Sequence, residues 1–152
     1  MEQRIYHGDI EPLALADYLV HHFDPQENLQ AQQIGETSNS TAVQIGHGDI
    51  PADLRNAVTV GIVSNTDGTS GITVTLGEQK WFPPNMATHT VAIGLVGLLF
   101  TPWALFGLLW PLSEIVKATT LPNDIWHAVD SYVLSMGGSL NATQDLQHPH
   151  IG

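Results

Sequence analysis

The side chains best suited to chemistry in this chain are its eight histidines, because imidazole binds metals and transfers protons near neutral pH. A metal site needs ligands that converge on one point. His21 and His22 are adjacent in an expected helix and point about 100° apart, and His148 and His150 lie in a polar C-terminal stretch. No HExxH motif is present, so we expect no metal site. The other four are His7, His47, His89 and His127.

The tetrapeptide His-Gly-Asp-Ile occurs twice, at residues 7–10 and 47–50. His–Asp pairs at this spacing occur in hydrolases, so His47 and Asp49 define one hypothesis, a small hydrolase. The simpler interpretation is a glycine turn followed by an aspartate that caps a helix, which suits Asp9. The chain has neither a nucleophile elbow around a serine nor a phosphate-binding glycine loop. We therefore predict that the protein has no catalytic residue, binds no cofactor and is not an enzyme.

Composition excludes several other functions. Fifteen acidic residues against four basic ones give a formal net charge of −11, and four cations cannot form the basic surface that nucleic acids require. The absence of cysteine excludes disulfides, thiolate catalysis and cysteine-based metal sites. Charged residues make up only 12% of the chain, about half the average for soluble domains, which leaves a membrane environment open.

The strongest single feature is residues 90–113, which are 24 residues without a charge. As one straight helix they would extend about 36 Å, whereas a bilayer core is about 30 Å thick. Trp81 and Trp110 are placed to lie at the two interfaces, where aromatic rings are enriched. His89 stands at the start of the segment, where it could ligate a tetrapyrrole metal or, more simply, keep its ring in water at the interface.

Pro102 lies in the middle of this segment and could divide it into two helices, 88–100 and 102–117, because an interior proline removes a backbone hydrogen bond. Three arrangements stay open: one kinked transmembrane helix, a hairpin that dips into one leaflet, and a helical pair buried in protein. In each, large apolar side chains would contact the membrane or a partner. The residues expected at these contacts are Trp81, Phe82, Leu95, Val96, Leu99, Phe100, Trp103, Phe106, Trp110 and Trp126.

The elements that must position this segment come before it. Residues 9–23 have apolar side chains at helical spacing and predict a helix that ends at Asp24-Pro25. Two alternating segments, 58–62 and 72–76, are separated by turn residues and predict a β-hairpin, and 29–34 and 41–46 are weaker strand candidates. The expected apolar helix face is Leu13, Ala16, Val20 and Phe23.

After the segment, residues 121–136 predict an amphipathic helix, with Pro122 in its first turn and Gly137-Gly138 at its end. The predicted fold is α+β. An N-terminal helix packs on a three- to four-stranded antiparallel sheet, followed by an apolar, proline-interrupted helical pair and a C-terminal amphipathic helix. The predicted divisions are an acidic α+β domain at 1–82, the apolar segment at 83–118, the amphipathic helix at 119–138 and a polar tail at 139–152.

The chain resembles a family of small uncharacterised bacterial proteins. The resemblance rests on Gly77, Lys80 and Trp81, where a strand runs into an apolar helical hairpin, and on the later motif Leu-Pro-x-x-Ile-Trp at 121–126. It covers about residues 5–136 and implies an arrangement of elements without an activity. Members often continue into a zinc ribbon, which this sequence lacks because it has no cysteine.

These observations favour a non-enzymatic, membrane-associated structural or scaffold protein that is a component of a larger assembly. We expect its bulk in the cytoplasm, because its N-terminus lacks the pattern of a signal peptide. Its expected partners are membrane lipid or a lipid monolayer, together with other proteins or further copies of itself. The alternatives are a soluble homo-oligomer with the apolar helices in a shared core and, second, the small hydrolase.

Overall fold

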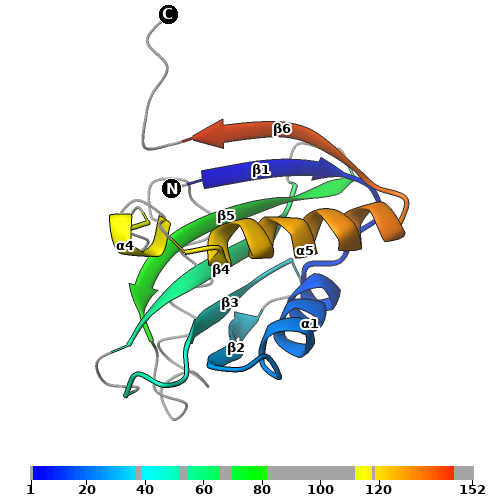
Figure 1. Cartoon of the computed structure of the whole chain (residues 1–152). Coiled ribbons are helices and arrows are strands. Elements are labelled where there is room, and N and C mark those ends of the chain that lie inside the picture. The colour runs from blue at the N-terminus through cyan, green and yellow to red at the C-terminus, as the bar shows by residue number, and fades with distance from the viewer. Residues whose placement is uncertain are drawn as a thin grey trace, which may run out of the picture.

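The protein is a two-layer structure in which two helices cover one face of a single antiparallel sheet (Figure 1). The computed structural model describes residues 2–36, 39–51, 55–65, 70–81, 112–117 and 119–145. The elements, in chain order, are β1 (Glu2–His7), α1 (Pro12–Phe23), β2 (Leu29–Glu36), β3 (Ser40–His47), β4 (Asn56–Ser64), β5 (Gly71–Lys80), α4 (Glu114–Lys117), α5 (Leu121–Ser135) and β6 (Ser139–Asp145).

The order of strands across the sheet is β2-β3-β4-β5-β1-β6, with every neighbouring pair antiparallel. Strands β2 to β5 follow one another as a meander. The first strand of the chain, β1, then lies between β5 and the last strand, β6. The sheet therefore joins residues that precede the apolar segment to residues that follow it.

Alternation along the strands decides which side chains meet the helices. Val43, Val60 and Leu76 are aligned across three strands and are completely buried on the helix-covered face. The α1 residues buried against this face are Pro12, Leu15, Ala16, Leu19 and Phe23. The predicted face of this helix was partly wrong. Ala16 and Phe23 are buried and Val20 packs against the core while partly exposed, but the face also includes Leu15 and Leu19 in place of Leu13.

The predicted fold class was wrong, because the sheet has six strands instead of three or four, and α1 lies between β1 and β2 in the chain. The predicted pairing of residues 58–62 with 72–76 is confirmed as β4 and β5, and the amphipathic helix is confirmed as α5. The two unforeseen strands are β1 and β6. Most residues of β1 that face the helices are polar, and β6 is a polar edge strand, so neither shows an apolar alternation.

The expected capping of α1 was also wrong. The residue before the helix is Glu11 rather than Asp9, and it makes no side-chain capping hydrogen bond. Pro12 occupies the start of the helix, where its missing N–H costs nothing.

The predicted helical pair falls mostly outside the described residues. Of the second predicted helix, 102–117, the structure describes residues 112–117, which include the four-residue helix α4. Within the part of the chain that the structure describes, no helix is long and apolar enough to cross a membrane.

Candidate functional site

The candidate site is the end of the sheet where the described chain stops before the apolar segment, at Trp81, and resumes after it, at Leu112. The segment leaves after Trp81, the residue that follows β5. The backbone N–H of Trp81 donates a hydrogen bond to the carbonyl of Arg55 at 3.0 Å, and the ring is only 8% exposed. The departure point is therefore fixed by backbone and side chain together.

Arg55 and Gly46 hold the Trp81 ring against the sheet face that α1 and α5 do not cover. The guanidinium of Arg55 lies over the indole at 4.7 Å from its centroid, a cation–π contact. The same guanidinium donates to the carbonyl of Ile50 at 2.7 Å and to the side chain of Gln30. A Cβ at Gly46 would lie 2.8 Å from Arg55 Cδ and 3.3 Å from the indole, so glycine makes room for this stack.

A ladder of polar side chains on the same face secures the end of β5. The amide of Gln44 donates to the carbonyl of Lys80 at 2.9 Å and accepts a hydrogen bond from Gln32 at 3.0 Å. Gln44 is completely buried, and Thr59 beside it is 1% exposed. A buried amide must be hydrogen-bonded to be stable, so this ladder specifies how β2, β3 and β5 align.

The chain returns on the helix-covered side of the same strand. One carboxylate oxygen of Glu78 accepts hydrogen bonds from the backbone N–H of Ser113 at 3.2 Å and from its hydroxyl at 2.9 Å. The neighbouring Leu112 is 4% exposed and belongs to the hydrophobic core. Glu78 precedes Trp81 by three residues, about 10 Å of strand. Both ends of the apolar segment are therefore fixed to the last residues of β5.

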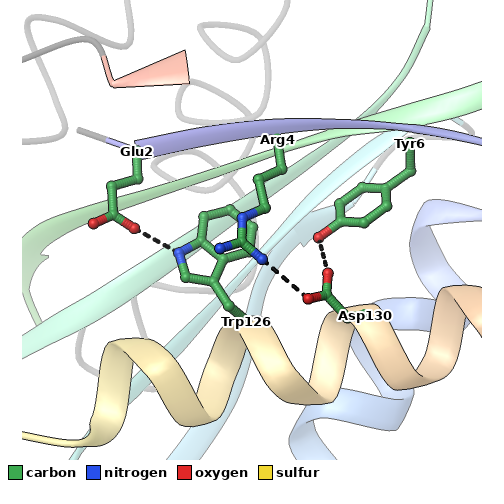
Figure 2. Close-up of polar contacts among 5 residues, drawn as sticks. All are labelled: Glu2, Arg4, Tyr6, Trp126 and Asp130. Atoms are coloured by element: carbon green, nitrogen blue, oxygen red, sulfur yellow. Dashed lines mark hydrogen bonds and ion pairs between the residues drawn. The ribbon is translucent and has the colours of Figure 1, made fainter. Parts of the chain in front are cut away.

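The helix that follows the segment is tied to the first strand of the chain by a polar cluster (Figure 2). Asp130 of α5 accepts a hydrogen bond of 2.6 Å from the Tyr6 hydroxyl and pairs with Arg4 at 3.0 Å. The Arg4 guanidinium lies 4.3 Å from the centroid of the Trp126 ring, whose N–H donates to Glu2. These contacts join residues more than 120 positions apart in the sequence.

Burial keeps one member of this cluster, the Tyr6 phenol, in its protonated form. Burial, together with the hydrogen bond to Asp130, raises the pKa of Tyr6 well above its ordinary value near 10. The phenol therefore remains a hydrogen-bond donor throughout the neutral and mildly alkaline range. The pKa of a second tyrosine, Tyr132 of α5, is also raised, because of burial and the nearby negative charges of Glu11 and Asp17.

Two of the residues predicted to contact a membrane or partner are described, and both pack within the domain. Trp81 is held by Arg55, and Trp126 is 3% exposed between α5 and β1. The eight others lie outside the described residues and stay predictions: Phe82, Leu95, Val96, Leu99, Phe100, Trp103, Phe106 and Trp110.

The histidines and the repeated tetrapeptide are not brought together. His7 pairs with Gly71 at the start of β5. His47 is the last residue of β3, and the residue before it is aligned, through β4, with Gln79 near the end of β5. The two motifs thus lie at opposite ends of the sheet and cannot share one site. Within the described ranges, no three metal-ligating side chains form a group that could hold an ion. His89, His148 and His150 lie outside those ranges.

Sequence reasoning missed Glu78, Arg55 and Asp130, the three charged residues that organise this end of the molecule and its connection to α5. Arg55 is 4% exposed and Glu78 is 6% exposed. One signal could have identified Arg55 and Glu78: charged residues are almost never fully buried unless they have partners, and these two lie within or beside strongly apolar strands. Asp130 lies on α5 and gave no such signal.

Comparison with known proteins adds no relative, because no protein-family model, curated protein or solved structure shows significant similarity to the chain.

Proposed function

We propose that the protein is a non-enzymatic, membrane-associated scaffold subunit. A folded α+β domain faces the cytoplasm, and the apolar residues between Trp81 and Leu112 anchor it to lipid. The observation that carries this proposal is the attachment of Trp81 and Ser113 to the end of one strand. The domain holds both ends of the segment, and we propose that the residues between them project from the sheet.

The chemistry of the segment supports lipid as its partner. It carries no Lys, Arg, Asp or Glu from residue 83 to residue 113. Burying such a segment in hydrocarbon is favourable, because each Leu, Ile, Phe or Val contributes about −0.3 to −0.6 kcal/mol at the bilayer centre. The scaffold role is carried over from the sequence, whose motifs predict no enzyme.

A second candidate is the soluble homo-oligomer in which the apolar helices form a shared core. This candidate keeps the same apolar segment and gives it further copies of the chain, rather than lipid, as its partner. This candidate predicts a defined oligomer in the absence of lipid and detergent.

Flotation with phospholipid vesicles tests the proposal and separates the two candidates. We expect the wild-type chain to float with the vesicles and Val96→Asp to stay at the bottom of the gradient. An aspartate at the centre of a membrane helix costs about 3 kcal/mol, or roughly a 100-fold weaker partition.

The matched control is Leu134→Asp, which makes a similar chemical change at a side chain 67% exposed on α5. This variant should float like the wild type. Flotation of Val96→Asp to the wild-type extent would contradict anchoring by the segment. A wild-type chain that stays below the vesicles as one defined oligomer would establish the second candidate instead.

A further inference from the structure

We propose that two copies of this chain associate about a two-fold axis through an apolar surface at the end of α5 and the start of β6. This α5–β6 surface consists of Leu134, Met136 and Leu140, whose side chains are 67%, 52% and 48% exposed. In the proposed pair, Met136 of each copy enters a small cavity of the other. The inference goes beyond the proposed function, because it involves neither lipid nor the apolar segment.

The cavity opens beside these exposed side chains and has a volume of about 180 Å³. Its walls are formed by Tyr6, Asp130, Val133, Leu134 and Leu140. The two polar members, Tyr6 and Asp130, are bonded to each other (Figure 2). Apolar cavities of about 150 Å³ can hold a benzene ring, so this one has room for a single apolar side chain.

The same surface carries a side chain that suits the cavity. Met136 directly follows α5 and is half-exposed, and it is not one of the residues that line the cavity. The flexible thioether of methionine fills irregular apolar gaps well. A surface that presents both a projecting apolar side chain and a cavity is self-complementary, which is what a two-fold interface requires.

The turn that presents Met136 is fixed by the fold. The N–H of Met136 donates to the carbonyl of Tyr132 at 3.1 Å, and the N–H of Gly138 donates to the carbonyl of Val133 at 2.9 Å. A Cβ at Gly138 would lie 2.5 Å from the carbonyl oxygen of His7, so the turn packs directly on the end of β1. The α5–β6 surface is therefore ordered before a partner arrives, which lowers the entropic cost of association.

The outer edge of β6 lies beside this surface. In the described sheet β6 has one neighbour, β1, so its other edge faces outward (Figure 1). The opposite edge strand, β2, differs, because Asp24 accepts a hydrogen bond of 3.0 Å from the N–H of Ala31. An outward strand edge can pair with a strand of another chain. Strand β6 can therefore extend the contact that Met136 begins.

Charge favours a second copy as the occupant. Each chain has a formal net charge of −11, so two copies repel each other unless the surfaces that meet carry no charge. Residues 131–144, which form the end of α5 and nearly all of β6, contain no Asp, Glu, Lys or Arg. The α5–β6 surface thus allows an equally acidic partner to approach.

Position disfavours lipid as the occupant. Ser139 at the start of β6 pairs with His7, and His7 pairs with Gly71 at the start of β5. Trp81 follows the other end of β5, which has ten residues and is about 33 Å long. Apolar residues that enter a membrane after Trp81 therefore leave from the opposite end of the sheet.

Sedimentation equilibrium of the full-length chain in dodecyl maltoside micelles tests the inference. The contact is small for a permanent interface, so we expect the wild-type mass to double as the protein concentration is raised. Met136→Asp would place an unpaired charge in each cavity and should raise the dissociation constant at least about 100-fold. Met136→Leu should dimerise within a few-fold of the wild type. Circular dichroism of each variant verifies that the domain is folded.

The matched control is Ile50→Asp, which makes the same kind of change at a side chain 39% exposed, beyond the end of β3. This variant should dimerise like the wild type, and so should Val96→Asp. A wild type that stays monomeric at every concentration, or a dimer that survives Met136→Asp, would overturn the inference. Loss of the dimer in Val96→Asp alone would also overturn it and would support the shared apolar core instead.

Hydrogen exchange and flotation provide two independent readouts. The amides of β6 should exchange more slowly at concentrations at which the wild type dimerises, and this protection should be absent in Met136→Asp. Met136→Asp should still float with vesicles, so loss of pairing and loss of anchoring are distinguishable. A monomeric wild type whose Met136→Asp variant fails to float would assign the α5–β6 surface to lipid and overturn the inference.

Discussion

At the scale of single residues, buried polar groups fix how the elements of this protein are aligned. The Tyr6 side chain is 1% exposed, and its hydroxyl is satisfied by Asp130. A hydrogen bond to a charged acceptor contributes about 1.5–3 kcal/mol, and an unpaired buried partner costs a similar amount. The contact therefore fixes the position of α5 on β1 as well as stabilising it.

We predict that Tyr6→Phe lowers the free energy of unfolding by about 1–2 kcal/mol at pH 7, because the hydroxyl bond is lost without creating a cavity. Urea denaturation followed by circular dichroism measures the difference. Asp130 is about one-third exposed, which places the expected loss toward the lower part of the range for charged acceptors.

The raised pKa of Tyr6 predicts how this difference depends on pH. The folded protein binds the phenol proton more tightly than the unfolded chain, so the contribution of Tyr6 is fully present below about pH 10 and decreases as pH rises above it. The difference in stability between the wild type and Tyr6→Phe should therefore shrink as the pH rises from about 10 to about 11.5. A constant difference over this range would show that Tyr6 is not held in its protonated form.

Gly46 provides a second test at this scale. We predict that Gly46→Ala destabilises the fold by about 1–3 kcal/mol, because the new methyl group would overlap Arg55 and press on the Trp81 ring. Thermal unfolding measures the loss, and tryptophan fluorescence reports whether the indole moves. Gly137→Ala is the contrasting variant, since its Cβ would meet no atom within 4 Å and only its positive φ would be strained.

The buried residues also show what the sequence could reveal at this scale. The apolar alternation of Val58, Val60 and Ile62 was readable because their inward side chains are uniformly hydrophobic. On β1 the inward positions are Glu2, Arg4 and Tyr6, whose partners Trp126 and Asp130 follow about 120 residues later. No local pattern encodes that contact, so the strand could not be predicted.

At the scale of elements, the contact between Glu78 of β5 and Ser113, the residue before α4, attaches the returning chain to the sheet. Glu78 is the only described residue bonded to both the backbone N–H and the hydroxyl of Ser113. The hydroxyl in turn accepts a bond from the N–H of Val116 at 3.3 Å. One carboxylate thus organises the turn that leads into α4.

We predict that Glu78→Ala reduces stability by about 2 kcal/mol and increases amide hydrogen exchange at Ser113 and Val116. The sheet should remain folded, because Glu78 is not one of the residues of the hydrophobic core. Glu78→Gln retains an oxygen acceptor and should give a smaller effect. Unchanged exchange at both amides in Glu78→Ala would contradict the assigned anchoring.

The existence of the main elements could be predicted from periodicity, but their arrangement could not. Helices α1 and α5 and the β4–β5 hairpin each have a local signal, whereas β6 has a polar sequence and pairs only with β1. The sheet order depends on that pairing across almost the whole chain. The position of the return point beside Glu78 depends on it as well, because it requires α5 and β6 to fold back onto the N-terminal strands.

At the scale of the whole molecule, the folded domain consists of two parts of the chain joined by one apolar segment. Because Trp81 and Ser113 are attached to the same end of β5, the connection between them needs little length. The domain and the segment are therefore expected to be separable, which makes the segment available for a role outside the fold.

We predict that replacing residues 83–111 with a flexible linker of about eight Gly and Ser residues preserves the domain, since such a linker reaches roughly 25 Å when extended. The variant should retain the far-ultraviolet circular dichroism of the strands and cooperative unfolding. It should also fail to float with vesicles. Loss of cooperative unfolding would show that the segment is part of the core, as the homo-oligomer candidate requires.

The measurement that tests the central claim most directly is fractionation of cells that produce the untagged chain, followed by carbonate and then detergent extraction. Anchoring by the apolar segment predicts that the protein stays in the membrane pellet through carbonate and is released only by detergent. Recovery in the supernatant, as a defined large species on size-exclusion chromatography, would contradict the account and place the segment inside a protein assembly.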